Sequence, residues 1–316
     1  MPRPAVLIGR FQPPHRAHLA LMQQALELAG ELVIVLGSAH SARTTRNPLL
    51  DAERRALIAE MLRSENIDPD RIRFESVPDV LYNLPLWVDL VQRAVNAEQA
   101  LLAGFDKDAS SFYLKLFPGW QTLELQVTLD TNATAIRKAM FRRDWAQVGQ
   151  GVTPAVLAGL LAFARTDAFN ELLADQYATQ HLAHLYPANT GPIRSAAALL
   201  VFGDQMLLYP RWERPGLGLW SLPEAASVER ALQLVPGADP GDLQPLRSRL
   251  LDAPQRVPGL DWQTRATLFR LASRLPVRPG AHWLPLELAQ THPETFFADH
   301  AQGVRALLEN WPGNEI

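Results

Sequence analysis

The amino-acid sequence predicts a doubly wound α/β domain built on a parallel sheet, followed by a smaller α+β domain. Over residues 1–140, short apolar runs alternate with segments of helical periodicity, which is the pattern of strand–helix–strand units. The stretch "YPANTGP" at 186–192 then has the Pro and Gly content of a linker. Beyond it, short apolar runs and many prolines replace the long helical segments. A length of 316 residues also favours two domains.

The first domain is predicted to contain four strands, each an apolar or alternating run, at 5–9, 31–39, 72–80 and 123–129. Helices are predicted where apolar residues recur with helical spacing, at 16–30, 47–65, 84–104, 110–120 and 132–144. Consecutive strands joined by a helix are expected to be parallel, with a right-handed crossover. Two further helices are predicted to lead toward the linker, at 153–166 and 168–185.

The second domain begins with a predicted hairpin, because two apolar runs within 193–211 flank Gly203 and Asp204. We therefore divide the chain into three parts. These are a first domain, a helical connector with its linker, and a second domain, at 1–165, 166–190 and 191–316.

The composition excludes several classes of protein. The net charge is −3 and charged residues make up 20% of the chain, which argues against a partner nucleic acid held by bulk charge. The chain has no cysteine, so disulfides, thiolate metal sites and cysteine nucleophiles are excluded. We see no leader peptide and no apolar run near the roughly 18 residues that cross a bilayer, so no membrane partner is predicted. We expect a cytoplasmic protein.

The turn after the first predicted strand, "GRFQPPHRAH" at 9–18, has the features of a phosphate site. Ligands of open α/β sheets bind at the carboxyl ends of the strands, where the following helix also points its free N–H groups. His15 and His18 are three residues apart and therefore share one helix face, from which both can donate to phosphate oxygens. Two histidines at this spacing are also compatible with a helix cap or a metal site. The turn is neither a Walker A loop nor a GxGxxG fingerprint.

The whole decapeptide resembles the "GRFQPxHxGH" motif of the HxGH nucleotidyltransferase superfamily, in the form found in archaeal-type nicotinamide mononucleotide adenylyltransferases. Ala17 stands where that family has Gly. Two later segments resemble other elements of the family: "TNATAIRKAM" at 131–140 is similar to "ISxTxIR", and 104–120 is similar to "GHxKDxSSYYLxLFPxW", with Phe105 in place of His. The resemblance implies a Rossmann-like nucleotidyltransferase fold.

The resemblance also implies roles for individual residues. The residues expected to be catalytic are His15, His18 and Arg137. Those expected to bind ATP are Gly9, Arg10, Phe11, Gln12, Gly104, Lys107, Asp108 and Thr134. A solvated turn is the alternative interpretation of the segment 106–108.

Two further segments resemble the part of the family that binds nicotinamide mononucleotide. In "VLGSAHSARTTRNPL" at 35–49, Arg46 and Asn47 are candidates for gripping the phosphate of that nucleotide, with Arg43 a weaker candidate. In "YNLPLW" at 82–87, Asn83 would bind the carboxamide and Trp87 would stack on the cationic ring. Core packing is the alternative for Trp87.

The implied reaction transfers the adenylyl group of ATP to nicotinamide mononucleotide, giving NAD⁺ and pyrophosphate without a protein nucleophile. Mg²⁺ is the implied cofactor, bound mainly by ATP and water, so no protein metal site is predicted. Three alternatives stay open: a different phosphate acceptor for an adenylyl- or cytidylyltransferase, nicotinic acid mononucleotide as acceptor, and a non-catalytic regulator that binds NAD or another nucleotide. The family also suggests a homo-oligomer.

The second domain resembles the Nudix partner of the bifunctional members of this family, in the segments 216–223, 252–256, 282–289 and 296–308. The Nudix box itself is degenerate. Glu224 and Ala225 replace the two glycines after "LP" at its entry, Ala231 takes the place of its first glutamate, and the first five positions of its REUxEE run fall on 239–243, where Pro240 and Gly241 would break a helix. We therefore predict a Nudix-like domain without hydrolase activity. Its role would be structural, or regulatory through a bound nucleotide such as NAD⁺ or ADP-ribose.

Overall fold

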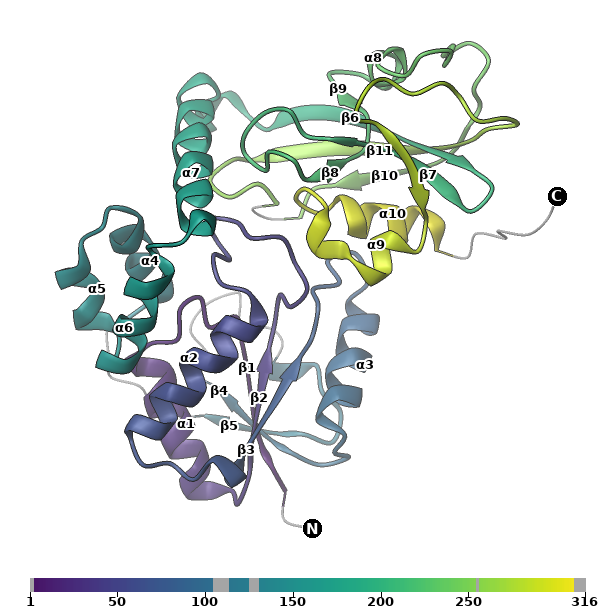
Figure 1. The fold of residues 1–316 in the computed structure, drawn as a ribbon. Coiled ribbons are helices and arrows are strands. Elements are labelled where there is room, and N and C mark those ends of the chain that lie inside the picture. The colour runs from purple at the N-terminus through teal and green to yellow at the C-terminus, as the bar shows by residue number, and fades with distance from the viewer. Residues whose placement is uncertain (1–2, 105–113, 125–130, 254–255, 310–316) are drawn as a thin grey trace. The chain divides into compact units, whose positions relative to one another are not determined.

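The computed structural model describes residues 3–104, 114–124, 131–253 and 256–309. The chain forms two compact units, Met1–Leu173 and Ala174–Ile316 (Figure 1). The boundary between them falls within helix α7 (Asp167–Leu185), inside the stretch predicted as a connector. Within the described residues, no helix is both long enough and apolar enough to cross a membrane.

The first unit contains a five-stranded parallel sheet with the strand order β3-β2-β1-β4-β5. Its strands are β1 (Ala5–Gly9), β2 (Leu32–Leu36), β3 (Ile72–Ser76), β4 (Leu101–Gly104) and β5 (Gln121–Glu124). The strand order reverses beside β1, so the sheet is doubly wound and the carboxyl end of β1 lies at the switch point. The predicted α/β class of this domain is confirmed.

The helices of the first unit cover both faces of the sheet (Figure 1). They are α1 (Arg16–Leu28), α2 (Asp51–Ser64), α3 (Leu84–Val95), α4 (Ala133–Phe141), α5 (Trp145–Gly151) and α6 (Pro154–Phe163), with a 3-10 turn at Pro69–Arg71. Alternate residues of β1 belong to different cores: Leu7 packs with α1, α2 and α4, whereas Val6 packs with α3. Both faces of β1 are therefore buried, which explains its continuous apolar run.

Two predicted helices of this unit are wrong in their bounds, and a third, predicted over 110–120, has only a 3-10 assignment at 114–115 within its described residues. The helix predicted over 84–104 ends at Val95, because Asn96 adopts a left-handed conformation with φ of 51°. The remaining apolar residues instead form β4, whose Leu101 pairs with Ala5 of β1. The helix predicted over 47–65 begins only at Asp51, where Glu53 Oε2 accepts a hydrogen bond from the N–H of Leu50 at 2.8 Å.

The second unit contains a seven-stranded mixed sheet. Its main path is β10-β11-β6-β7-β12, and the short strands β8 and β9 pair with β7 and β6. The strands are β6 (Ile193–Phe202), β7 (Gln205–Pro210), β8 (Trp220–Ser221), β9 (Glu224–Ala225), β10 (Pro245–Leu251), β11 (Trp262–Arg270) and β12 (His282–Pro285). Its helices are α8 (Val228–Gln233), α9 (Leu288–Thr291) and α10 (His300–Leu308). The predicted hairpin at 193–211 is confirmed by the antiparallel pairing of β6 and β7 around Gly203.

Candidate active site

The turn after β1 is fixed by a buried glutamine. Gln12 is 1% exposed, and its side chain makes two hydrogen bonds with the main chain of Leu49. Its Nε2 donates to the carbonyl oxygen at 2.7 Å, and its Oε1 accepts from the N–H at 2.9 Å. Gly9 lies under the same turn, where a Cβ atom would stand 2.9 Å from the ring of Phe11. The turn is therefore held against the segment that precedes α2, and Gly9 is required for a close approach.

The two histidines of the turn lie together at the N-terminus of α1. His15 is the N-cap residue, and its backbone N–H donates to Nδ1 of His18 at 3.3 Å. The two rings stack with their centroids 3.7 Å apart, and the ring of Phe11 lies edge-on to His18 at 4.7 Å. Because Nδ1 of His18 accepts a hydrogen bond, the neutral ring carries its proton on Nε2. Ala17, which replaces the glycine of the motif, is buried.

Arg137 joins this turn from α4, although it lies 125 residues away from Gln12 in the sequence. Its guanidinium donates to the carbonyl oxygen of Gln12 at 2.7 Å and to Oγ1 of Thr134 at 3.2 Å. Thr134 stands in the first turn of α4, whose N-cap is Asn132. Burial lowers the pKa of Arg137 to about 10, and the charges of Arg10 and Arg46 act in the same direction.

Arg10 and Arg46 complete a cluster of cations at the carboxyl edge of the sheet. Arg10 donates to Oδ1 of Asn47 at 3.2 Å. Burial lowers the pKa of Arg10 to about 10, with Arg46 adding to the effect and Asp79 opposing it. The pKa of Arg46 is also lowered by burial, against the opposing charge of Asp79. Guanidinium groups that repel one another in a partly buried site favour a polyanionic ligand.

Two residues of this region were missed in the sequence analysis. Asp79 accepts a hydrogen bond from Oγ of Ser38 at 2.7 Å, and it follows β3, so its position after a strand was an available signal. Arg54, in α2, is fully buried and donates to the carbonyl oxygens of Arg10 and Gly37, both at 2.6 Å. The sequence gives no sign of this, because Arg54 lies in a helix rich in charged residues.

The residues predicted to bind nicotinamide mononucleotide lie in different structural surroundings. Asn83 is the N-cap residue of α3, and its Oδ1 accepts from the N–H of Leu86 at 3.1 Å. Trp87 is half-buried, and its ring lies 5.9 Å from that of Phe117. Arg43, the weaker phosphate candidate, makes a bidentate ion pair with Glu53 at 2.6 and 2.8 Å.

The remaining ATP candidates come from 104–108. Gly104 ends β4, and a Cβ atom there would lie 2.7 Å from the side chain of Leu114. Lys107 and Asp108 lie outside the described residues.

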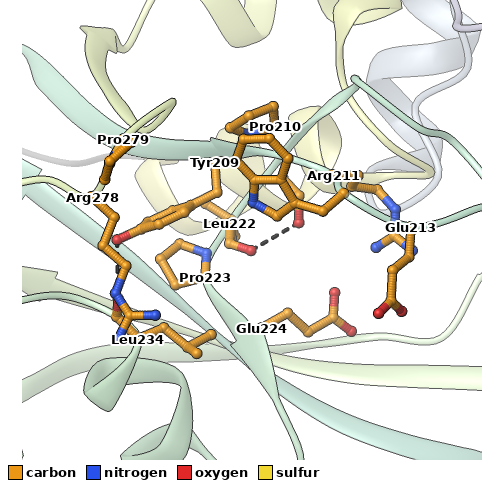
Figure 2. A pocket seen from close by; sticks show the side chains of 12 residues that line it. Tyr209, Pro210, Arg211, Glu213, Leu222, Pro223, Glu224, Leu234, Arg278 and Pro279 are labelled. Atoms are coloured by element: carbon orange, nitrogen blue, oxygen red, sulfur yellow. Dashed lines mark hydrogen bonds between the residues drawn. The ribbon is translucent and has the colours of Figure 1, made fainter.

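The second unit has a pocket of about 470 Å³. Its lining comes mainly from the ends of β7 and β8 and from the segment around 278, and includes Tyr209, Arg211, Trp212, Glu213, Glu224 and Arg278 (Figure 2). Trp212 is 66% exposed. Arg211 lies over the ring of Phe297, 3.7 Å from its centroid. The pocket thus combines aromatic surface with charges of both signs.

Glu224, the first of the two residues that replace the glycines after "LP", belongs to a buried polar network. Its Oε1 accepts from Oγ1 of Thr264 at 3.0 Å and from Oγ of Ser195, and its Oε2 lies 3.3 Å from Nε2 of His300. The N–H of Leu222 donates to Nδ1 of His300 at 3.1 Å, so the proton of the neutral imidazole lies on Nε2, facing Glu224.

The charge of Glu224 is stabilised by this network. Burial would raise the pKa of Glu224, but the nearby imidazole of His300, the charge of Arg256 and the hydrogen bond from Ser195 together lower it to about 2. A carboxylate that is held in this way stays ionised throughout the neutral range.

The segment that replaces the Nudix box has little helix. Helix α8 covers only Val228–Gln233, and Asp239 accepts a hydrogen bond from the N–H of Gly241 at 2.9 Å in the turns that follow. Across the described parts of both units, no three His, Asp or Glu side chains are grouped so as to hold a metal ion.

The fold and the cation-rich edge of the first unit define an α/β domain whose switch point is suited to anionic ligands. In agreement, the model of the cytidylyltransferase-like family matches residues 6–139. The nicotinamide/nicotinic acid mononucleotide adenylyltransferase of Acinetobacter baylyi strain ADP1 is 38% identical over 189 residues, which cover 57% of this chain and 96% of that protein. The chain belongs to the family of nicotinamide/nicotinic acid mononucleotide adenylyltransferases.

Other comparisons agree with this assignment. The nicotinamide-nucleotide adenylyltransferase of Ignicoccus hospitalis is 41% identical over 98 residues, which cover 31% of this chain and 57% of that protein. The crystal structure of a bifunctional NMN adenylyltransferase/ADP ribose pyrophosphatase from Francisella tularensis aligns with a TM-score of 0.86 at 22% identity, covering 98% of this chain and 99% of that one. A structure of such a protein from the same organism, complexed with AMP and a Mn ion, aligns with a TM-score of 0.84. The two-domain fold is thus shared with a known bifunctional protein.

Proposed function

We propose that the first unit transfers the adenylyl group of ATP to nicotinamide mononucleotide, forming NAD⁺ and pyrophosphate. The observation that carries the proposal is the cluster of Arg10, Arg46 and Arg137 beside His15 and His18, at the switch point of a sheet in a chain of this family. A triphosphate and a second phosphate need several cationic donors at one place, and this cluster supplies them.

In the proposed reaction, a phosphate oxygen of nicotinamide mononucleotide attacks the α-phosphorus of ATP. The bond between that phosphorus and the oxygen bridging to the β-phosphate breaks, and pyrophosphate leaves. Catalysis would come from positioning and from electrostatic stabilisation of the developing charge. His15 and His18 would donate to the reacting phosphates, Thr134 and Arg137 would hold the leaving pyrophosphate, and Arg46 with Asn47 would orient the acceptor phosphate.

Mg²⁺ would enter with ATP as part of the substrate. The cradle presents guanidinium and imidazole groups, whereas this hard cation prefers oxygen ligands, so ATP oxygens and water would hold it. When bound, it supplies neutralisation of phosphate charge.

A panel of acceptors tests the proposal against other phosphate acceptors. The protein would be incubated with ATP labelled at the α-phosphate and, in turn, with nicotinamide mononucleotide, nicotinic acid mononucleotide, 4′-phosphopantetheine and glycerol 3-phosphate. We expect the label to appear in NAD⁺ with the first acceptor. The second tests whether the acid is also accepted. Transfer to either of the last two alone would contradict the proposal.

A regulator that binds nucleotides without catalysis is tested by His18→Ala. As a catalytic donor, His18 should affect turnover far more than ATP affinity. If His18 only binds nucleotide, His18→Ala should change turnover and ATP affinity by the same factor. If the protein is a non-catalytic regulator, the wild-type protein should show no turnover.

For the second unit we propose a fold of the Nudix type that does not hydrolyse nucleoside diphosphates. Two observations support this. Helix α8 has six residues, too few to present the spaced carboxylates of a Nudix box. In addition, the Glu224 carboxylate is bound to Ser195, Thr264 and His300.

A second candidate function for this unit is regulatory nucleotide binding, which the pocket of about 470 Å³ favours. Arg211 and Arg278 could hold an anionic group, and the exposed ring of Trp212 could stack on a base. Calorimetric titration of the full chain with ADP-ribose tests this. We expect one binding event per chain that Trp212→Leu and Arg278→Gln weaken. If no heat of binding is measured, or if both variants bind as the wild-type protein does, the second unit would have a structural role instead.

A further inference from the structure

Arg54 is a cation buried in the first unit without any exposed surface. It projects from α2, and its NH1 atom donates to the carbonyl oxygens of Arg10 and Gly37, both at 2.6 Å. Its NH2 atom lies 3.4 Å from the carbonyl oxygen of Ser38. These carbonyls belong to the two chain segments that leave β1 and β2.

Arg54 binds these segments where the sheet no longer does. The backbone bond from Gly37 N–H to the carbonyl oxygen of Gly9, at 2.9 Å, lies at the end of the β1–β2 ladder. Beyond it, Arg10 turns toward Asn47, and Ser38 bonds to Asp79. The Arg54 guanidinium thus takes the place of β1–β2 backbone hydrogen bonds where the side chains of Arg10 and Ser38 project.

Local helix stability does not explain an arginine at this position. Arg54 is the fourth residue of α2, and a cation near a helix N-terminus opposes the helix dipole. Burial also disfavours its charge and lowers its pKa. A buried apolar side chain would avoid both costs. Two features account for an arginine here: the carbonyl oxygens that converge on its guanidinium, and the positive charge that Arg54 places behind Arg10. That charge helps to lower the pKa of Arg10.

We propose that Arg54 is a positioning residue for adenylyl transfer, which holds the main chain of Arg10 and of Gly37–Ser38 so that the Arg10 guanidinium meets the phosphates of ATP. The inference rests on the proposed function, because its kinetic test requires that the protein catalyses adenylyl transfer. Arg54 itself would not touch the substrate and would act through Arg10.

Arg71 provides a matched control in the same unit. It also donates to three main-chain carbonyl oxygens, those of Leu26, Ala29 and Gly30, at 2.6, 2.9 and 3.0 Å. These acceptors lie at the end of α1 and before β2, at the opposite edge of the sheet from the candidate site. A loss of carbonyl anchoring at Arg71 would therefore lower stability without disturbing the phosphate cradle.

The test compares Arg54→Met, Arg54→Lys and Arg71→Met with the wild-type protein, well below the lowest melting temperature of the four. Steady-state kinetics with ATP and nicotinamide mononucleotide give kcat and KM, and calorimetry gives ATP affinity without turnover. Displacement of a catalytic group by about 1 Å can cost on the order of 100-fold in rate. We expect kcat/KM for ATP to fall about 100-fold in Arg54→Met and to change by less than about threefold in Arg71→Met.

Arg54→Lys distinguishes positioning from folding, because an ammonium group retains the charge and can reach some of the carbonyls. It should recover at least about tenfold over Arg54→Met. Equal losses in Arg54→Met and Arg71→Met, or no recovery with lysine, would overturn the inference. If wild-type protein forms no NAD⁺, the proposed function fails, and Arg54 is then judged by ATP affinity alone. Weaker binding in Arg54→Met but not in Arg71→Met supports its role, and equal affinity overturns it.

Discussion

Substitution of Glu224 by Gln should remove a large, pH-dependent contribution to the stability of the second unit. The pKa of this carboxyl falls from an ordinary value of 4.5 to about 2 in the folded protein, because His300, Arg256 and Ser195 outweigh the effect of burial. That difference corresponds to on the order of 3 kcal/mol favouring the folded state when the carboxyl is ionised in both states. The side chain is only 10% exposed, so solvent screens little of it.

The sign of the pH dependence follows from the lowered pKa. A carboxyl whose folded pKa is depressed contributes fully above its unfolded pKa of 4.5, and the contribution disappears as the pH falls toward about 2. Wild-type protein should therefore lose stability steeply between these limits. In Glu224→Gln the unfolding free energy should be lower at pH 7, and its decline in acid should be shallower.

Differential scanning calorimetry of the full chain, at pH values from 7 to 3, would measure this. Glu287→Gln is the control, because Glu287 is an exposed glutamate of the same unit. We expect the control to follow the wild-type curve. If Glu224→Gln also follows it at every pH, the charge of Glu224 does not stabilise the fold and the reasoning is refuted.

Three further perturbations concern the first unit. Gln12→Leu removes two hydrogen bonds to the buried main chain of Leu49. It should cost about 2–4 kcal/mol in urea unfolding, and an unchanged midpoint would contradict the proposed anchoring of the turn. Gly9→Ala places a methyl group against the ring of Phe11. The unfolding free energy should fall by about 1–3 kcal/mol, seen as a lower melting temperature. An unchanged melting temperature would mean that the Phe11 ring moves away without cost. Tripolyphosphate should raise the melting temperature, and less so in Arg137→Gln, because the anion would interact with a guanidinium whose pKa is lowered to about 10 by burial and, to a smaller extent, by the charges of Arg10 and Arg46. Near pH 10, tripolyphosphate binding should be accompanied by proton uptake, seen as a binding heat that depends on the buffer. An equal rise in the melting temperature of wild-type protein and Arg137→Gln would argue against the site.

Much of the sheet of the first unit was predictable, because β1 and β2 are continuous apolar runs and β3 alternates, with long helices between them. Strand β4 was not, since Leu101–Gly104 is only four residues long and follows an apolar helix without an intervening Gly or Pro. The second sheet was predictable only at its hairpin. Its longest pairing joins β6 to β11, with Ile193 opposite Trp262, and such long-range registers leave no local signal.

The candidate site shows the same division. The residues of the turn after β1 stand together in the sequence, so their chemistry was visible there. Arg54 was not recognisable, because its two closest acceptors lie 44 and 17 residues away along the chain. Glu224 was noted only as a departure from the Nudix box, and its partners Ser195, Thr264 and His300 come from three distant segments.

Chromatography of the products formed from ATP, Mg²⁺ and nicotinamide mononucleotide would show whether the first unit transfers the adenylyl group. ADP-ribose and NAD⁺ would be supplied as hydrolysis substrates in the same buffer. We expect NAD⁺ and pyrophosphate to form in equal amounts, and supplied ADP-ribose and NAD⁺ to stay intact. Absence of NAD⁺ would contradict adenylyl transfer by the first unit. Cleavage of ADP-ribose would contradict the proposal that the second unit does not hydrolyse.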